Sequence, residues 1–244
     1  IGIELDDAVG NHYLEEMISK FNGVFPSARE FSEYARNTLD DVDPVSEPDD
    51  SLLRWMEREE ILFRTLERHM VKERLKQGFV SENKVDVDDF IRFSLSVQNR
   101  RKSRAGHAFE NHVERLLMVH QIHYSRNPVV ENKKHPDFLF PDIRAYNDKN
   151  FPEAYLSMLG VKSTCKDRWR QIMSEADRIE RKHLLTLEAA ISVNQTEEMK
   201  AGKIQLILPE KIHGTYTQGQ RKWLYSVEHF LKEVKDRQKA CNWL

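Results

Sequence analysis

Apolar residues recur at three- and four-residue intervals through the first half of the chain, which is the spacing of one helix face. This spacing predicts short helices at 14–21 and 28–39. It also predicts a long helix that begins at a cap formed by Asp50 and Ser51 and ends near Lys76, before Gly78. Two further helices are expected at 87–98 and 105–121, separated by a basic run.

The pattern changes after residue 122, where short apolar runs stand between prolines. Runs at 122–124, 138–140, 155–161 and 204–208 predict strands, whereas 169–187 and 223–234 have helical spacing. Helices therefore precede an alternation of strands and helices. This order predicts an α/β fold with helical additions at its N-terminal side.

Composition narrows the class of protein. Hydrophobic residues make up 39% of the chain, and no apolar run approaches the roughly 20 residues of a membrane-spanning helix. Cys165 and Cys241 are too few for a disulfide framework or a zinc site, which favours a reducing, cytosolic setting. The chain begins at Ile1 without a basic and apolar leader, so we expect a fragment or a processed form.

A net charge of -2 conceals an asymmetry between the two ends of the chain. Residues 1–50 hold 13 acidic and 3 basic side chains, and the acidic excess peaks at 40–50 beside Pro44 and Pro48. We expect an N-terminal helical and acidic linker segment at 1–50, exposed where it is most acidic, and a catalytic domain at 51–244. The basic excess after residue 50 suits a polyanion partner, although lysines and arginines that solvate long helices produce the same balance.

Candidate chemistry lies at the ends of two predicted strands. Asp137 opens the strand at 138–140, and Lys162 lies 25 residues later, near the end of the next strand. On adjacent strands the two side chains can meet at one end of a sheet, where a carboxylate suits Mg²⁺ and a lysine can orient or deprotonate an attacking water. Glu175 follows on the predicted helix, which can direct it back towards the strand ends. Phosphodiester hydrolysis needs these parts, but the Pro-Asp dipeptide alone is common in turns.

Three segments resemble a known family over most of the chain from about residue 50. They are Arg104-Ala105-Gly106 with Phe109-Glu110, Pro136 to Pro141, and Val161 to Gln171 with Glu175. Together they resemble the catalytic domain of EcoRII-type restriction endonucleases, within the PD-(D/E)XK nuclease superfamily. The superfamily pattern has an acidic residue where this chain has Gly160. In the EcoRII-like subset the following helix supplies that carboxylate, and Glu175 matches it.

The resemblance implies a restriction-endonuclease-like fold, with a central mixed sheet flanked by helices, and a Mg²⁺ cofactor. It implies that Asp137 is the central metal ligand, Glu175 the second carboxylate and Lys162 the catalytic lysine. It also implies positions in or beside the active site for Lys166 and Tyr146. Glu110 matches an acidic residue that leans towards the metal, although a solvated helix carboxylate explains it equally well.

The resemblance further implies that Asp167, Arg168 and Arg170 read adjacent G·C pairs in the major groove. Arginine can pair with guanine O6 and N7, and aspartate can accept from cytosine N4. A surface ion-pair set at a helix start is the alternative. Contacts to phosphates, which position a protein without specifying sequence, are expected from Arg100, Arg101, Lys102 and Arg104.

The function implied is that of a bacterial, cytoplasmic restriction endonuclease that cuts both strands of double-stranded DNA. The expected site is CCWGG, cut on the 5′ side of the first cytosine. Because the site is nearly palindromic, we expect a homodimer. Because its central base pair cannot obey the two-fold symmetry, we expect the central bases to be flipped out. Residues 1–50 are expected to be the remnant of a connection to an N-terminal effector domain. Without that domain we expect cleavage of single sites.

Two alternatives stay open. One is a DNA-binding module whose nuclease centre is silent, and the other is a repair or structure-selective nuclease on the same fold. A zinc hydrolase site needs paired histidines, and the segment with His107 and Glu114 does not contain such a pair. No glycine-rich phosphate loop surrounds Gly106 or Gly160, so a nucleotide cofactor is not expected.

Overall fold

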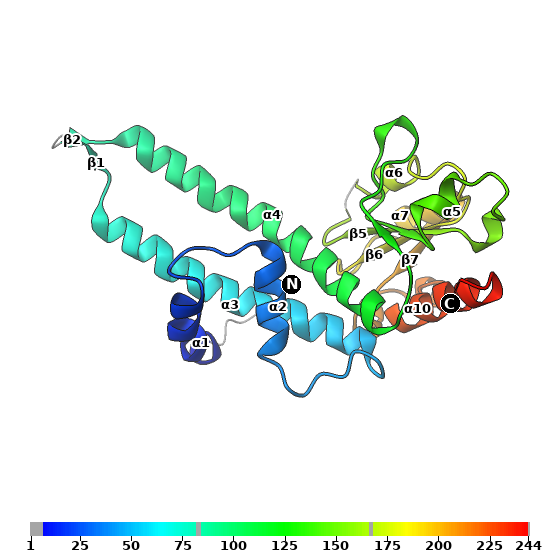
Figure 1. The fold of residues 1–244 in the computed structure, drawn as a ribbon, viewed down its shortest axis with the longest axis horizontal. Helices are drawn as coiled ribbons and strands as arrows, with labels where there is room; N and C mark the ends of the chain where they lie inside the picture. The colour runs from blue at the N-terminus through cyan, green and yellow to red at the C-terminus, as the bar shows by residue number, and fades with distance from the viewer. Residues whose placement is uncertain (1–6, 82–83, 166–167, 244) are drawn as a thin grey trace. The chain divides into compact units, whose positions relative to one another are not determined.

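A computed structural model of the chain describes residues 7–81, 84–165 and 168–243 (Figure 1). The chain packs as two compact units. The helical unit comprises Ile1–Asp41 and Arg54–Asn111, and the sheet unit comprises Val42–Leu53 and His112–Leu244. These units are defined by packing, and their limits do not coincide with residue 50. The expected division at residue 50, between a linker segment and a catalytic domain, is a functional one and stays a prediction.

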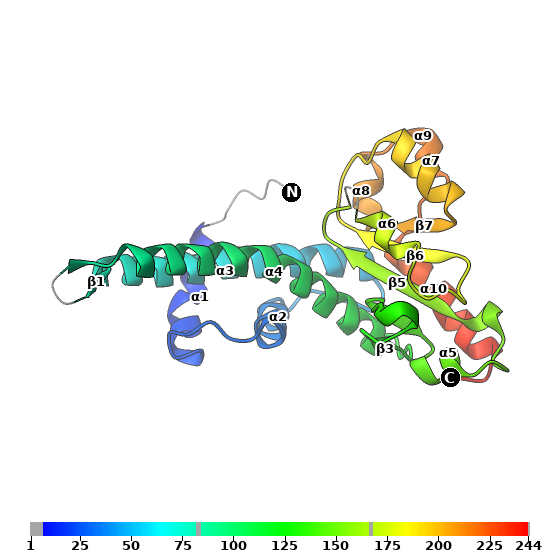
Figure 2. The same ribbon diagram turned by 90° about the horizontal axis from the view of Figure 1, so that it is seen from above.

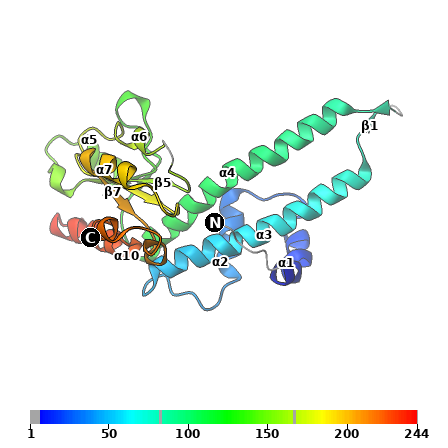
Figure 3. The same ribbon diagram turned by 180° about the vertical axis from the view of Figure 1, so that it is seen from behind.

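Two long helices and the hairpin between them dominate the helical unit (Figures 1 and 3). The elements in chain order are α1 (Asp7–Lys20), α2 (Ala28–Asn37), α3 (Pro48–Gln77), β1 (Val80–Ser81), β2 (Lys84–Val85) and α4 (Val87–Val119). The prediction of two helices at 87–98 and 105–121 is wrong, because α4 runs through both. The basic run between them is made largely of arginine and lysine, which are good helix formers and do not end a helix.

The sheet unit is built on five strands in the order β3-β4-β5-β6-β7. These are β3 (Ser125–Arg126), β4 (Phe138–Phe140), β5 (Ser157–Lys162), β6 (Lys182–Thr186) and β7 (Ile204–Ile207). β4 is antiparallel to both β3 and β5, whereas β6 is parallel to β5 and to β7. The sheet is therefore mixed, with its change of direction at β5.

The helix predicted over 169–187 is wrong in most of its length. Only α6 (Trp169–Ile172) is helical there, and Lys182–Thr186 forms β6. Every residue of β6 is buried, because the strand lies inside the sheet and both its faces are covered. The sequence of this strand, Lys-His-Leu-Leu-Thr, lacks a strict alternation of polar and apolar residues, so periodicity alone does not mark it as a strand.

Helices cover both faces of the sheet (Figure 2). Phe230 of α10 (Val227–Ala240) packs against Phe140 and His183 on one face. The other face carries α6 and α7 (Val193–Ala201). The remaining elements are η1 (Glu131–Lys133), α5 (Ile143–Asn147), η2 (Glu153–Tyr155), α8 (Glu210–His213) and α9 (Gln218–Arg221).

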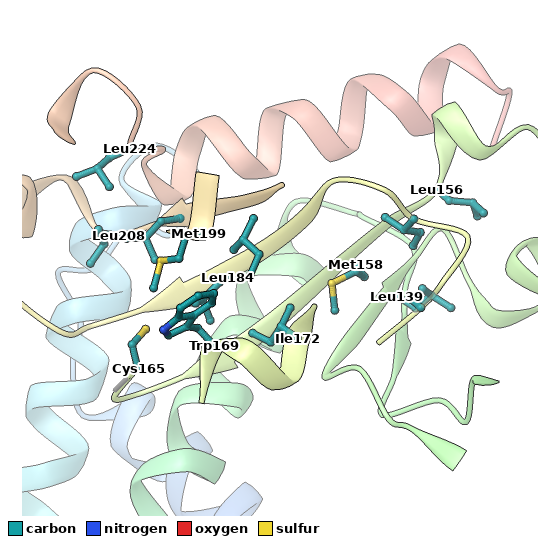
Figure 4. Packing of buried hydrophobic residues seen from close by; sticks show 14 of the residues in the cluster. Leu139, Leu156, Met158, Cys165, Trp169, Ile172, Leu184, Met199, Leu208 and Leu224 are labelled. Atoms are coloured by element: carbon teal, nitrogen blue, oxygen red, sulfur yellow. The ribbon is translucent and has the colours of Figure 1, made fainter. Parts of the chain in front are cut away.

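The main core lies between the sheet and α6 with α7 (Figure 4). Met158 and Leu184 from adjacent strands meet Trp169 and Ile172 from α6 and Met199 from α7, and all five side chains are fully or almost fully buried. Burial of this apolar surface holds α6 against the sheet. No helix among the described residues is long and apolar enough to cross a membrane.

The acidic stretch at 40–50 is only partly the exposed linker that was expected. Residues 45–47 are exposed, but the side chain of Asp49 reaches the start of two helices. Its carboxylate accepts from the backbone N–H of Val227 at 2.9 Å and of Glu228 at 2.8 Å, at the start of α10. It also accepts from the N–H of Glu210 at 3.0 Å, at the start of α8. These bonds attach the first turn of α3, which belongs to the sheet unit, to two other helices of the same unit.

Candidate active site

The antiparallel pairing of β4 with β5 brings the two candidate catalytic residues together. Phe138 lies opposite Leu159, so the residue before β4 faces the last residues of β5. The Asp137 carboxylate accepts from the Lys162 ammonium at 2.7 Å and from the backbone N–H of Val161 at 2.6 Å. Both side chains are largely buried, with 14% of Asp137 and 19% of Lys162 exposed. The predicted meeting of these side chains at one end of the sheet is therefore observed.

Glu175 lies close to this pair but on a loop, not on the predicted helix. α6 ends at Ile172, and Glu175 stands in the bend that follows. Burial raises the pKa of Glu175 to about 7; Lys162 opposes this rise, and the charge of Asp137 adds to it. The structure thus gathers Asp137, Lys162 and Glu175 within electrostatic reach of one another.

Gly160 stands where the superfamily pattern has an acidic residue, and the structure gives a packing reason for it. A Cβ atom at this position would lie 2.5 Å from Cδ1 and 3.0 Å from Cγ1 of Ile172, which is buried under the sheet (Figure 4). Any side chain here would therefore force the Ile172 side chain out of its place. The second carboxylate has to come from elsewhere, and Glu175 follows this same helix.

Tyr146 lies beside the loop that carries Glu175. Its side chain is 2% exposed, and its hydroxyl donates to the Glu131 carboxylate, with 2.7 Å to each oxygen. Burial and the bond to Glu131 raise the pKa of the Tyr146 phenol. The hydroxyl also accepts from the backbone N–H of Arg178 at 3.3 Å. These contacts connect Tyr146 to the Glu175 loop, and its predicted place in or beside the active site stays a prediction.

The segment expected to read DNA is described in part. Lys166 and Asp167 lie outside the described residues. Arg168 is exposed at the start of α6. Arg170 is 56% exposed, pairs with Glu198 of α7 at 2.7 Å and lies over the ring of Trp169 at 4.5 Å. Arg170 thus forms the kind of surface ion pair that was the alternative to base readout, whereas readout by Arg168 stays a prediction.

Five of the predicted residues lie on α4 within the helical unit. They are Arg100, Arg101, Lys102, Arg104 and Glu110. Arg104 is 9% exposed, pairs with Glu60 and lies 3.7 Å from Glu59. Because its guanidinium is buried and already paired with glutamates of the same unit, Arg104 is poorly placed to contact a DNA phosphate. The other four keep their predicted roles as predictions.

Two lysines that were not among the predicted site residues, Lys134 and Lys182, interact electrostatically with Glu175. The Lys134 ammonium donates to the carbonyl of Ser174 at 2.9 Å, and the Lys182 ammonium donates to the carbonyl of Ile179 at 2.8 Å. Burial lowers the pKa of Lys182, against the opposite effect of Asp177 and Glu175. Lys182 stands at the start of a strand that is buried along its whole length, which is a usable signal. The helix predicted over 169–187 hides this signal, because a lysine on a solvated helix is common.

The donor set fits a hard divalent cation. Asp137 and Glu175 supply carboxylate oxygens, the ligands that Mg²⁺ takes in small number while it keeps several waters. Glu175 is a partly buried carboxylate beside a second carboxylate, and a cation between them would favour its ionised form. Among the described residues, no group of three or more His, Cys, Asp or Glu side chains is arranged to hold a metal. Two protein carboxylates are thus the ligands on which a metal site here would depend.

Comparisons with known proteins agree on one group. A sequence profile of the family described as EcoRII C terminal matches residues 63–231. The type II restriction enzyme EcoRII of Escherichia coli is 39% identical over 240 residues, which cover 96% of this chain and 56% of that protein. The chain thus spans little more than half the length of this relative.

Solved structures of DNA complexes share the fold. Metal-depleted Ecl18kI with uncleaved DNA superposes with a TM-score of 0.75 at 17% identity, over 96% of this chain and 87% of that one. The PspGI complex with substrate DNA gives a TM-score of 0.65 at 15% identity, over 95% and 93%. The predicted restriction-endonuclease-like fold, a mixed sheet flanked by helices, is confirmed.

Proposed function

Since this chain belongs to the EcoRII C-terminal family, we propose that it is the catalytic domain of a type II restriction endonuclease. The proposed reaction is Mg²⁺-dependent hydrolysis of both strands of double-stranded DNA at a short specific site. One observation carries the proposal: Asp137 and Lys162 meet at 2.7 Å at the end of the sheet, with Glu175 within electrostatic reach of both. A largely buried acid–lysine pair next to a second carboxylate is the set of groups that phosphodiester hydrolysis requires.

Each residue has a distinct part in this proposal. Asp137 and Glu175 hold the cation, and Lys162 orients the attacking water and offsets charge on the phosphate. The bond from the Val161 N–H to Asp137 fixes the direction of that carboxylate. When Mg²⁺ is bound, it polarises the scissile phosphate and lowers the pKa of a bound water. Glu110, Lys166 and Tyr146 are proposed to support the site.

The proposed DNA site is CCWGG, cut on the 5′ side of the first cytosine. Arg168, with Asp167 and Arg170, is proposed to read its G·C pairs. Arg100, Arg101 and Lys102 of α4 are proposed to contact phosphates, whereas the buried Arg104 is not. The two-fold symmetry of the site favours a homodimer in which each subunit cuts one strand. The proposed setting is the bacterial cytoplasm.

Two other functions remain as outcomes of the test. A DNA-binding module with a silent nuclease centre would retain the exposed Arg168 while Asp137, Lys162 and Glu175 had no catalytic use. A repair or structure-selective nuclease would use the same centre on another substrate, because the fold alone does not fix the substrate.

The decisive experiment is cleavage of a duplex that carries one CCWGG site, in Mg²⁺ and in EDTA, beside the Lys162→Ala variant. Cleavage at the site in Mg²⁺ that is lost in the variant supports the proposal. Retention of the site without cleavage under every divalent metal supports the silent module. Preferential cleavage of a mismatched or branched duplex supports the structure-selective nuclease.

A further inference from the structure

The loop that carries Glu175 contains an unfavourable backbone turn directly beside the carboxylate. Ala176 is 1% exposed and has a left-handed backbone, with φ of 52°. Residues with a side chain adopt this region rarely, because their Cβ atom crowds the backbone. Such a turn persists only where the surrounding contacts hold it in place. The position of Glu175 therefore depends on what restrains this loop.

Arg178, two residues after Ala176, makes such contacts. Its guanidinium donates to the carbonyl oxygens of Asp148 at 3.0 Å and of Phe151 at 2.9 Å, and also to that of Tyr146. The side chain is 19% exposed, and the Glu153 carboxylate lies 3.7 Å from Nε. One guanidinium thus binds three carbonyls along the segment 146–151. An arginine can do this because its planar group carries five N–H donors in a fixed arrangement.

The segment 146–151, whose carbonyl oxygens accept from Arg178, belongs to the connection between β4 and β5. Asp137 immediately precedes β4, and Lys162 ends β5. Arg178 therefore ties the loop of the second carboxylate to the connection between the strands that carry the other two groups. On the other side of Glu175, Lys134 holds the carbonyl of Ser174 at 2.9 Å. The loop is restrained on both sides of the carboxylate.

We propose that Arg178 is a positioning residue for Glu175 and sets the separation of the two metal-binding carboxylates. The inference rests on the proposed function, in which Glu175 is the second carboxylate of the metal site. Without the three carbonyl contacts the turn at Ala176 relaxes, and Glu175 moves away from Asp137. A displacement of about 1 Å in a catalytic arrangement can cost on the order of 100-fold in rate.

The test uses two variants of Arg178 in the full chain. Arg178→Met keeps much of the length and removes every donor, and Arg178→Lys keeps the charge without the planar fork. Single-turnover cleavage of a duplex with one CCWGG site is measured over a range of Mg²⁺ concentrations. Both variants are expected to cleave about 10- to 100-fold more slowly and to need several-fold more Mg²⁺ for half-maximal rate. Affinity for the duplex in EDTA is expected to stay within about twofold of wild type.

A matched control separates positioning from a general loss of structure. The Arg221 guanidinium donates to the carbonyls of Tyr216 at 2.8 Å and Gly214 at 2.7 Å, so Arg221→Met loses a similar clamp in a different loop. Its Mg²⁺ requirement is expected to equal that of wild type. An equal rise in the Mg²⁺ requirement of Arg221→Met would overturn the inference, and so would wild-type Mg²⁺ dependence in Arg178→Lys.

A second-site change gives an independent readout. Glycine adopts a left-handed backbone without crowding, so Ala176→Gly reduces the need for a restraint at this turn. Combined with Arg178→Met, it is expected to recover the cleavage rate at least threefold. Because it removes strain, this double variant also provides a folded protein if Arg178→Met alone melts early. No recovery in a folded double variant contradicts the proposed link between Arg178 and the turn.

Glu175→Gln, assayed beside these variants, keeps the two proposals distinguishable. If Glu175→Gln cleaves like wild type with the same Mg²⁺ dependence, Glu175 is not a metal ligand and both proposals about it fail. If Glu175→Gln is inactive while Arg178→Met matches wild type, the metal site stands and the role of Arg178 fails alone.

Discussion

At the scale of single residues, the environment of Glu175 determines its charge. The group is partly buried beside Asp137, and its pKa is raised to about 7, although Lys162 opposes the rise. A carboxyl group with a raised pKa in the folded state favours folding while it is protonated. Without metal, that contribution is present below the ordinary pKa near 4.5 and is lost as the pH rises through about 7.

Glu175→Gln is therefore expected to stabilise the metal-free protein at pH 8. The gain should be on the order of 1 kcal/mol, allowing for the partial exposure of the group, and should vanish near pH 4. Denaturant unfolding in EDTA at a series of pH values measures it. Added Mg²⁺ should stabilise wild type more than the variant, because only wild type supplies the second carboxylate. An equal effect of Mg²⁺ on both proteins would contradict the role of Glu175 in the metal site.

Position 160 requires a glycine, because the Ile172 side chain fills the space next to it. A Cβ atom would lie 2.5 Å from Ile172 Cδ1, so Gly160→Ala is expected to lower the free energy of unfolding by about 1–3 kcal/mol. Ile172→Val removes the Cδ1 atom and should recover part of that loss in the double variant, as thermal or denaturant unfolding will show. Strictly additive effects of the two substitutions would show that the contact does not exist.

At the scale of elements, Asp49 joins three helices. Its carboxylate caps the starts of α8 and α10 from the first turn of α3. Asp49→Ala removes this acceptor from three N–H groups at helix starts, of which the one on buried Val227 is the most sheltered from water, so we expect a loss of about 1–2 kcal/mol in unfolding free energy. Asp50→Ala is the matched control. It breaks only the surface ion pair with Lys211 and should cost less than about 1 kcal/mol. Equal losses in both variants would rule out the capping role.

The elements also show how far sequence patterns reach. Strands β4, β5 and β7 stand close to the predicted runs, because each combines a short apolar stretch with nearby turn residues. The antiparallel pairing of β4 with β5 made the meeting of Asp137 and Lys162 predictable. The sequence pattern predicts a helix where β6 lies, because burial on both faces removes the alternation that marks a strand. The loop position of Glu175 and the contacts of Arg178 depend on tertiary packing, which no local pattern records.

At the scale of the whole molecule, the proposed function requires a symmetric protein to recognise a DNA site with an odd number of base pairs. The central base pair of CCWGG cannot obey a two-fold axis, and flipped central bases would resolve the mismatch. With 2-aminopurine at the central position, saturating protein is expected to increase fluorescence several-fold, because an unstacked base is less quenched. A duplex with 2-aminopurine outside the site is the control. Unchanged fluorescence at the central position would exclude flipping.

A dimer in which each subunit cuts one strand makes a further prediction. Each chain contributes one set of Asp137, Lys162 and Glu175, so a mixed dimer of wild-type and Lys162→Ala subunits has one working centre. Such a preparation is expected to nick a plasmid with a single CCWGG site and to accumulate open circles, whereas wild type produces linear DNA. Differently tagged subunits allow the mixed species to be purified. Linear DNA as the first product of the mixed dimer would mean that one centre cuts both strands, and the assignment of one strand to each subunit would fail.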